Sequence, residues 1–239
     1  MPPRAAMLVI GDEILSGRTR DANMHHLAGR LAAHGLTLTE VRVVADAPDA
    51  IRDAVRALSG TYDHLFTSGG IGPTHDDITA ESVAGALDVP ISVRADARAL
   101  LAAHYEAQGL ELNEARLRMA RIPDGATLIP NPISAAPGFS IGNVHVMAGV
   151  PAIFEAMLEA LLPRLAGGDP LLSETLAIYR GEGEIAEPLG ALATAYPDLS
   201  FGSYPFQRDG AYAAHVVIRG HDAARLAAAL AELRALFPA

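Results

Sequence analysis

Short apolar runs alternate with helical segments between residues 7 and 87, and this alternation constrains the fold more than any other feature of the chain. Strand-like runs occur at 7–10, 38–44 and 64–67. Each is followed by residues whose apolar side chains recur at helical spacing, such as Leu27 and Leu31. A β-α-β-α-β-α order is typical of a parallel sheet with helices on both of its faces, so we expect an α/β fold.

The later part of the chain predicts further helices, a hairpin and a second, smaller unit. Helices are expected at 95–108, at 113–120 and from Pro151 to about residue 165, and Gly142-Asn143 separates the two strands of a hairpin. A glycine-rich stretch at 167–170 indicates a linker. Beyond it, a strand, a helix, two strands and a helix form a β-α-β-β-α unit with an α+β fold. We therefore expect domains at 1–167 and 171–239, with elements of the second at 175–179, 185–195, 199–204, 211–219 and 222–237.

Charge and hydropathy exclude several kinds of partner. The 239 residues have a formal net charge of −10 at pH 7, which disfavours a broad surface for nucleic acid or anionic membranes. No run of about 18 apolar residues is present, and the apolar stretch near the N-terminus is too short for a signal peptide. We expect a cytoplasmic protein that binds neither nucleic acid nor a membrane, and a homo-oligomer, since symmetric assemblies are common.

The sequence contains neither Cys nor Lys, and each of these absences excludes a kind of chemistry. Without Cys, the chain has no disulfide, no thiolate nucleophile and no zinc site built on thiolates. All 18 basic residues are Arg, so Schiff-base catalysis and the phosphate-binding lysine of a P-loop are also excluded. An anionic ligand must be held by arginines, backbone amides or a metal ion. Arg18, Arg20 and Arg208 are the arginines that we consider for this role.

The segment 68–79 is the strongest candidate for a binding site. Gly69, Gly70 and Gly72 allow backbone conformations that other residues avoid, and they let a ligand approach the main chain closely. The segment joins a strand to the start of a helix, where free amides and the helix dipole favour a phosphate group. In open α/β sheets, ligands bind at this edge of the sheet. The segment matches neither the dinucleotide fingerprint nor a P-loop.

Two neighbouring carboxylates, Asp76 and Asp77, follow these glycines. Carboxylates beside a phosphate site are expected where Mg²⁺ bridges the two anions, because carboxylate alone would repel phosphate. We therefore expect Asp76 and Asp77 to bind a divalent cation, with Mg²⁺ favoured and Mn²⁺ or Co²⁺ as alternatives. The competing interpretation is a tight turn in which Asp77 or Thr79 caps the following helix.

Polar residues also follow the strands at 7–10 and 38–44. Gly11, Asp12 and Glu13 leave the first strand, and Asp46 leaves the second. Because carboxyl ends of parallel strands meet at one edge, these residues could face the glycine-rich segment across one crevice. Asn23 would add a further hydrogen-bonding group, although Asn23 and Asp46 also stand where helix N-caps are common. The predicted ligand-binding residues are Gly11, Asp12, Glu13, Asn23, Ser68, Gly69, Gly70, Gly72, Pro73, Thr74 and Thr79, and the predicted catalytic residues are Asp46, Asp76 and Asp77.

Two other patterns do not favour an active site. Residues 138–142 have G-x-S-x-G spacing, but a nucleophile elbow needs a helix after its turn, and residues 144–147 indicate a strand. His25 and His26 are adjacent on a helix, so that their side chains diverge by about 100° and do not converge on one metal ion.

Several sequence motifs together resemble those of a known family, and they are spread over nearly the whole chain: Gly11–Leu15 with Gly17 and Asn23, Ser68–Thr79, Ala136–Phe139, Gly149–Pro151 and Gly202–Pro205. The chain resembles the molybdopterin-binding (MoaB/Mog-like) superfamily and, within it, the N-terminal domain of the CinA family. It is also similar to the first domain of eukaryotic FAD synthase. The resemblance implies a three-layer α/β domain with a mostly parallel sheet, followed by a small α+β unit.

The resemblance also implies three activities. One is adenylyl transfer to molybdopterin in molybdenum cofactor biosynthesis. The others are cleavage of the pyrophosphate bond of ADP-ribose and of FAD. Each makes or breaks a phosphoanhydride beside AMP, where backbone amides and a divalent cation can stabilise charge on phosphorus. We expect hydrolysis of an ADP-containing metabolite, and we do not expect FAD synthesis from these residues. The alternatives are adenylyl transfer and a module that binds a nucleotide or pterin without turnover.

Overall fold

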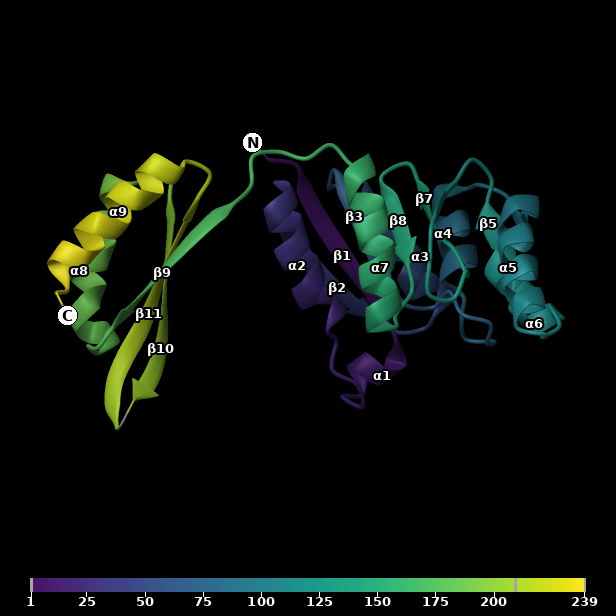
Figure 1. The fold of residues 1–239 in the computed structure, drawn as a ribbon, viewed down its shortest axis with the longest axis horizontal. Coiled ribbons are helices and arrows are strands. Elements are labelled where there is room, and N and C mark those ends of the chain that lie inside the picture. Colours follow the sequence, from purple (N-terminus) through teal and green to yellow (C-terminus); the bar gives the residue numbers. More distant parts are fainter. Residues whose placement is uncertain (1, 209, 239) are drawn as a thin grey trace. The chain divides into compact units, whose positions relative to one another are not determined.

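The structure is a computed structural model that describes residues 2–208 and 210–238 (Figure 1). The chain forms two compact units, of which one ends at Gly168 and the other begins at Asp169. The outer limits predicted for the two domains, residues 1 and 239, lie outside the described residues. Within the described residues, no helix is long and apolar enough to cross a membrane.

The larger unit is built on a mostly parallel sheet of six strands. The strand order is β2-β1-β3-β8-β7-β6, and the pairs β1–β2, β1–β3 and β3–β8 are parallel. β7 is antiparallel to both of its neighbours, which confirms the predicted hairpin with β8. The strands span Arg4–Ile10 (β1), Thr37–Val44 (β2), His64–Ser68 (β3), Thr127–Ile129 (β6), Gly138–Ile141 (β7) and Val144–Met147 (β8).

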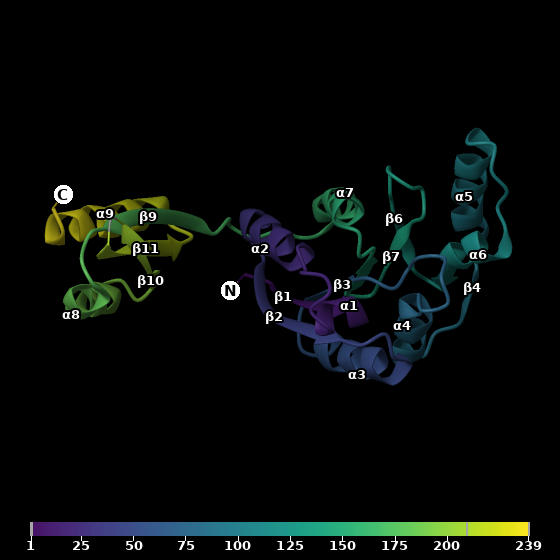
Figure 2. The same cartoon turned by 90° about the horizontal axis from the view of Figure 1, so that it is seen from below.

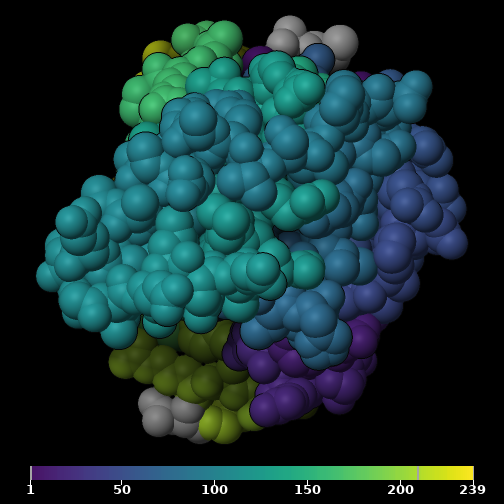
Figure 3. Space-filling model, turned by 90° about the vertical axis from the view of Figure 1, so that its right-hand side faces the viewer, coloured from purple at the N-terminus to yellow at the C-terminus, as the bar shows by residue number. Residues whose placement is uncertain are grey.

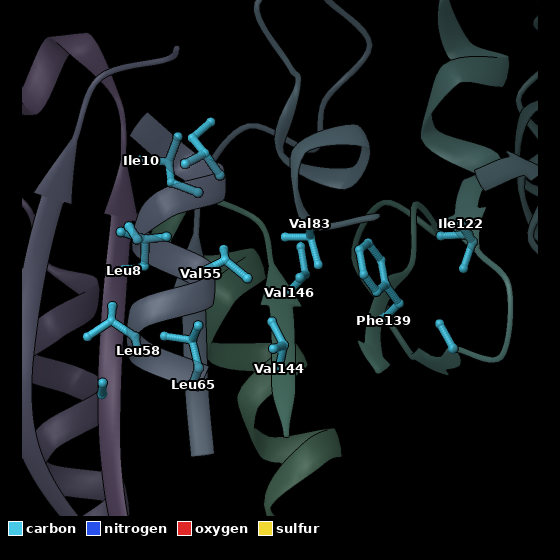
Figure 4. Packing of buried hydrophobic residues seen from close by; sticks show 14 of the residues in the cluster. Leu8, Ile10, Val55, Leu58, Leu65, Val83, Ile122, Phe139, Val144 and Val146 are labelled. Carbon is cyan, nitrogen blue, oxygen red and sulfur yellow. The ribbon is translucent and has the colours of Figure 1, made fainter. Parts of the chain in front are cut away.

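Helices cover both faces of this sheet, which confirms the three-layer fold. Figure 2 shows α2 (Asn23–His34) and α7 (Pro151–Leu161) on one face, and α3 (Pro48–Ser59) and α4 (Thr79–Leu87) on the other. The side chains of β1 explain this arrangement, because neighbouring side chains on a strand point to opposite faces of the sheet. Leu8 packs with α3 and α4 in one core, whereas Met7 packs with α2 and α7 in the other. Figure 4 shows the first of these cores.

An extension beyond α4 completes this unit. It holds α5 (Ala95–Ala107), a short α6 (Glu114–Leu117), a 3-10 turn at Arg118–Ala120 and the small strands β4 (Ile91–Val93) and β5 (Arg121–Pro123). Seen from this end, the teal segments of the extension lie in front, beside the bluer residues of α3 and α4 (Figure 3). The helix predicted at 113–120 is thus a short helix followed by a 3-10 turn. The short α1 (Asp12–Leu15) replaces part of a predicted loop.

The smaller unit has the predicted β-α-β-β-α order. Its elements are β9 (Leu172–Ile178), α8 (Glu182–Ala195), β10 (Ser200–Arg208), β11 (Ala211–Gly220) and α9 (Ala223–Leu236). The three strands form an antiparallel sheet in the order β10-β11-β9. Apolar side chains of both helices, including Ile185 and Leu226, pack with Val216 and Ile218 of β11 in a separate core. This unit therefore has a hydrophobic core of its own.

Candidate functional site

The glycine-rich segment lies at the point where the strand order of the sheet reverses. β1 lies between β2 on one side and β3 on the other. The chain segments that leave β1 and β3 therefore diverge from neighbouring carboxyl ends, which is where ligands bind in open α/β sheets. Gly11 follows β1, and Gly69 follows β3. The fold thus brings two of the predicted ligand-binding segments together.

Close backbone contacts explain two of the glycines in this segment. Gly69 has a φ of 110°, and a Cβ atom there would overlap the carbonyl oxygen of Ile10 at the end of β1. Gly70 has a φ of 68°, and its Cβ would overlap the hydroxyl of Thr79. L-amino acids rarely adopt these conformations. The glycines therefore let the segment fold tightly across the ends of β1 and β3.

A cleft of about 530 Å³ opens beside this segment. Its polar side includes Glu13, Asp46, Asp76 and Asp77. Its apolar side comes from distant parts of the chain, with Met119, Ala136, Val150 and Ile153 among its residues. A cleft of this size with a few convergent polar groups is typical of small-molecule sites. Of the predicted residues, Gly11, Glu13, Asp46, Gly69, Gly70, Gly72, Pro73, Asp76 and Asp77 line this cleft.

The two neighbouring carboxylates have different surroundings. Asp77 Oδ2 accepts hydrogen bonds from the Thr74 amide at 2.8 Å and from the Thr74 hydroxyl at 2.6 Å, so it closes the loop on itself. Asp76 lines this cleft and also a second one, of about 660 Å³, which Asp12, Glu13 and Asp46 line as well. Asp77 therefore shapes the loop, while Asp76 faces other acidic residues.

Asp46 joins the ends of β1 and β2. Its Oδ2 accepts a hydrogen bond from the Asp12 amide at 2.9 Å, and the Asp46 amide donates to Asp12 Oδ1 at 3.4 Å. Partial burial raises the pKa of Asp46, and the negative charges of Asp12, Glu13 and Asp76 raise it further, while the Asp12 amide opposes the shift. The two clefts share Glu13, Asp46 and Asp76, so negative charge is concentrated at their boundary.

The oxygen donors at this boundary suit a hard divalent cation. No group of three or more His, Asp or Glu side chains is arranged to hold a metal ion among the residues that the structure describes. Mg²⁺, however, is commonly bound by one or two carboxylates together with phosphate oxygens and water. The mutual repulsion that raises the pKa of Asp46 is also what a bound cation would relieve. The donor set therefore fits Mg²⁺ when a phosphate completes its coordination.

Four predicted residues lie behind the cleft and hold its backbone. Asn23 Nδ2 donates to Ser68 Oγ at 2.7 Å and to the Gly149 carbonyl at 2.8 Å. Thr79 donates its hydroxyl to the Gly69 carbonyl at 2.9 Å. The fourth residue, Thr74, is bonded to Asp77 as described above. These side chains join the loop to neighbouring elements, and none of them lines either cleft.

The structure contradicts the interpretation of these residues as helix caps. No side-chain hydrogen bond caps α3 at Ala47 or α4 at Ile78, so neither Asp46 nor Asp77 nor Thr79 is the N-cap of its helix. Asn23 is also turned inward. Asp21 accepts the hydrogen bond from the Met24 amide at the start of α2 instead. Local sequence rules favour caps at such positions, but hydrogen bonds to other partners, such as Asp12 for Asp46 and Thr74 for Asp77, orient these side chains.

Sequence reasoning missed the wall of the cleft that comes from residues 119–153. Asn131, Ser134 and Val150 line the cleft. The motifs at 136–139 and 149–151 gave a signal for part of this wall, but no local pattern pointed to Met119. Arg18 lines the second cleft, whereas Arg208 lies on β10 of the other unit and donates to Tyr179. The guanidinium beside the glycine-rich segment belongs to Arg118, which the sequence did not single out.

The G-x-S-x-G pattern does not form a nucleophile elbow. Residues 138–147 form the β7–β8 hairpin, in which Ser140 and His145 are paired across the strands. Ser140 Oγ and His145 Nδ1 are 2.9 Å apart, and His145 Nε2 lies 3.1 Å from His64 Nδ1. Burial lowers the pKa of His145 to about 3, which makes this side chain a poor general base at neutral pH.

Comparisons with known proteins agree with this architecture. Residues 6–167 match the family described as a probable molybdopterin binding domain, and residues 170–239 match the FAD synthase middle domain. The crystal structure of CinA from Thermoplasma acidophilum, a protein described as of unknown function, is similar with a TM-score of 0.63 and 34% identity. The alignment covers 68% of this chain and 98% of that chain.

Two relatives extend the comparison. A protein from Caldivirga maquilingensis is 36% identical over 182 residues, which cover 74% of this chain and 71% of that protein. A CinA-like protein from Citrifermentans bemidjiense is 38% identical over 169 residues, or 69% of this chain. The matched part spans only 41% of that CinA-like protein.

The fold and the cleft at its switch point thus define a molybdopterin-binding-type α/β domain with a small α+β unit after it. The chain belongs to the molybdopterin-binding domain family and is CinA-like, which confirms the resemblance found in its motifs.

Proposed function

We propose that this protein hydrolyses the pyrophosphate bond of an ADP-containing metabolite of the FAD or ADP-ribose type with the help of a divalent cation. The observation that carries the proposal is the shared boundary of the two clefts, where Glu13, Asp46 and Asp76 face the glycine-rich segment. A diphosphate placed at this boundary lies between backbone amides and carboxylates, as cleavage with a bridging cation requires.

Backbone amides are the proposed ligands of the diphosphate. The amides of Gly70, Ile71 and Gly72 donate no hydrogen bond within the part of the chain that the structure describes. All three residues line the first cleft, and Gly70 and Gly72 carry no side chain that would separate the main chain from a ligand. Free amides near a helix N-terminus favour an anion. This arrangement suits a chain that has no lysine for phosphate binding.

We assign the divalent cation to Asp76, because Mg²⁺ is commonly bound by one or two carboxylates together with phosphate oxygens and water. The carboxylate of Asp77 lines the same cleft, but its Oδ2 is engaged by Thr74, so its main role in the proposal is to shape the loop. When bound, Mg²⁺ would neutralise charge on the phosphate oxygens. Mn²⁺ and Co²⁺ are the alternatives, since both accept oxygen ligands.

Asp46 is the proposed proton acceptor. Its raised pKa makes it a better base than an ordinary aspartate. In the proposed reaction, a water oxygen forms a bond to one phosphorus atom while the bridging P–O bond breaks. Asp46 accepts a proton from the attacking water, and the bridging oxygen leaves with the other phosphate. The products are AMP and the monophosphate of the other half of the metabolite.

The test is to incubate the purified protein with FAD or ADP-ribose and Mg²⁺, Mn²⁺ or Co²⁺, and to measure AMP. Asp76→Asn removes a charge from the cleft boundary, and we expect it to lower the rate by at least about 100-fold. Glu106→Gln, at an exposed position on α5, makes the same charge change away from the cleft and serves as the matched control. Absence of AMP release, or an Asp76→Asn variant as fast as the parent, would contradict the proposal.

A second candidate function is binding of a nucleotide or pterin without turnover. The observation that favours it is that no three acidic or histidine side chains of the described residues are arranged around one metal position. Calorimetry distinguishes the two functions. Binding that does not depend on Mg²⁺ and gives no product supports the binding module, whereas release of AMP supports the hydrolase.

We also propose that the protein works as a cytoplasmic homo-oligomer, because soluble proteins commonly form symmetric assemblies. Sedimentation equilibrium of the purified protein tests the oligomeric state. A single species at the monomer mass of 24.9 kDa would contradict it.

A further inference from the structure

Arg118 lies directly behind the glycine-rich segment. It begins the 3-10 turn after α6, and its Nη2 donates a hydrogen bond to the carbonyl oxygen of Asp77 at 3.3 Å. Its Nε is buried and has no partner. Among the described residues, it forms no ion pair, whereas the neighbouring Arg121 is paired with Glu81 at 2.7 Å. Arg118 is therefore a cation whose charge is not neutralised by a carboxylate in contact with it.

Residues of the glycine-rich segment lie between this guanidinium and the first cleft, because they line the spaces on both sides. Arg118 lines a small cavity of about 10 Å³, which has room for about one water molecule. Gly70, Ile71, Gly72 and Asp77 line both this cavity and the first cleft. A positive charge in such a place acts on an anion in the cleft through a poorly solvated region, where screening is weak.

The hydrogen bond to Asp77 also fixes the orientation of one peptide group. The Asp77–Ile78 bond is trans, so its carbonyl and its amide point in opposite directions. Because Arg118 holds the carbonyl from behind, the Ile78 amide points away from Arg118. This amide donates no hydrogen bond within the described chain, and Ile78 lines the second cleft. Arg118 therefore holds a free donor in place at the start of α4.

We propose that Arg118 is a positioning residue for diphosphate binding: it orients the Asp77–Ile78 peptide and supplies positive charge behind the glycine-rich segment. The inference rests on the proposed function for its ligand, a diphosphate. It does not depend on hydrolysis. It also explains how a chain without lysine places a fixed cation next to its most glycine-rich loop.

Calorimetric titration of the intact protein with inorganic pyrophosphate, with and without Mg²⁺, tests this role. We expect Arg118→Gln to weaken binding by about tenfold or more, and Arg118→Lys to recover part of the loss because it restores the charge without the planar donor group. Arg98→Gln changes the net charge equally at an exposed position on α5, and we expect it to bind as the parent does. Millimolar guanidinium should partly restore binding to Arg118→Ala, which a merely structural role would not predict.

Three results would overturn the inference. They are parental affinity in folded Arg118→Gln, equal losses in Arg118→Gln and Arg98→Gln, and a parent protein that does not bind pyrophosphate. If Arg118→Gln fails to fold, the test uses Arg118→Lys and Arg118→Ala, the latter without added guanidinium. Parental affinity for pyrophosphate in both variants would refute the role. AMP release is measured separately. If pyrophosphate binding depends on Arg118 but no AMP is released, only the proposed hydrolysis is refuted. If AMP is released but binding does not depend on Arg118, only this inference is refuted.

Discussion

Asn23 and Ser68 form a buried hydrogen bond of 2.7 Å that joins the start of α2 to the end of β3. Both side chains are almost completely buried, with 3% and 2% of their surface exposed. The same Asn23 amide holds the Gly149 carbonyl, so one side chain connects three segments around the cleft. Asn23 Oδ1 is also buried and has no hydrogen-bond partner among the described residues.

Replacement of Asn23 should therefore weaken both the fold and the site. Asn23→Ala leaves Ser68 and the Gly149 carbonyl without this donor, and we expect the free energy of unfolding to fall by about 1–3 kcal/mol. Urea denaturation measures the change. His25→Ala, at the exposed neighbouring position of α2, should stay within about 0.5 kcal/mol of the parent. Equal effects of the two substitutions would argue against a role for the Asn23 hydrogen bonds.

Gly69→Ala tests the tight fold of the segment across β1. The new methyl group would overlap the Ile10 carbonyl, and the φ of 110° disfavours any L-residue. We expect a loss of about 2 kcal/mol or more in stability and loss of pyrophosphate binding in calorimetry. The control is Gly29→Ala in the interior of α2, where a Cβ meets open space. It should gain about 0.5–1 kcal/mol, because alanine favours helix. If Gly69→Ala binds pyrophosphate as tightly as the parent, the proposed binding of the diphosphate by the glycine-rich segment is contradicted.

Asp46→Asn should have opposite effects on the free energy of unfolding, which we expect to rise, and on AMP release, which we expect to be lost. Because burial and neighbouring charges raise the folded-state pKa of Asp46, the folded protein binds more protons than the unfolded chain above pH 3.8. This contribution therefore makes stability fall as pH rises through that region. Asp46→Asn removes this cost, and we expect urea denaturation at pH 7 to show a more stable protein, together with loss of AMP release. Asp53→Asn, on the exposed side of α3, should change neither quantity. A destabilised Asp46→Asn would show that its hydrogen bonds to Asp12 outweigh the repulsion.

His145 should make the larger unit sensitive to acid. Its pKa is about 3 in the folded protein because it is buried, against an ordinary value of 6.5. The unfolded chain therefore binds the extra proton below pH 6.5, and stability falls as pH decreases from there toward 3. At pH 5 we expect about 2 kcal/mol less stability than at pH 7 from this side chain alone.

Urea denaturation of His145→Gln across this pH range tests the assignment, since glutamine does not titrate. The slope of the free energy of unfolding against pH should decrease by the amount that corresponds to about one bound proton. His75→Gln, whose parent side chain is 97% exposed in the glycine-rich segment, should keep the parental pH dependence. An unchanged slope in His145→Gln would assign the acid sensitivity to other groups, such as His64, whose pKa burial also lowers.

The class of fold follows from local patterns in the sequence. Alternating strands and helices up to residue 87 predict a parallel sheet covered on both faces, because each amphipathic element must bury its apolar side and short connections limit how this can be done. The glycines at 69, 70 and 72 likewise indicated a tight loop at a strand end. These signals are local, since they depend on spacing and on backbone conformations that only glycine adopts readily.

Which side chains form the cleft, and which contacts each of them makes, depends on long-range packing. Asp76 and Asp77 are adjacent in sequence, yet one faces Asp46 across the cleft boundary and the other closes its own loop. Val150 reaches the site because β8 pairs with β3, and Arg118 reaches it because Arg121 of β5 is paired with Glu81 of α4. Such contacts follow from the order of strands and the packing of helices over the whole sheet, and no short stretch of sequence contains that information.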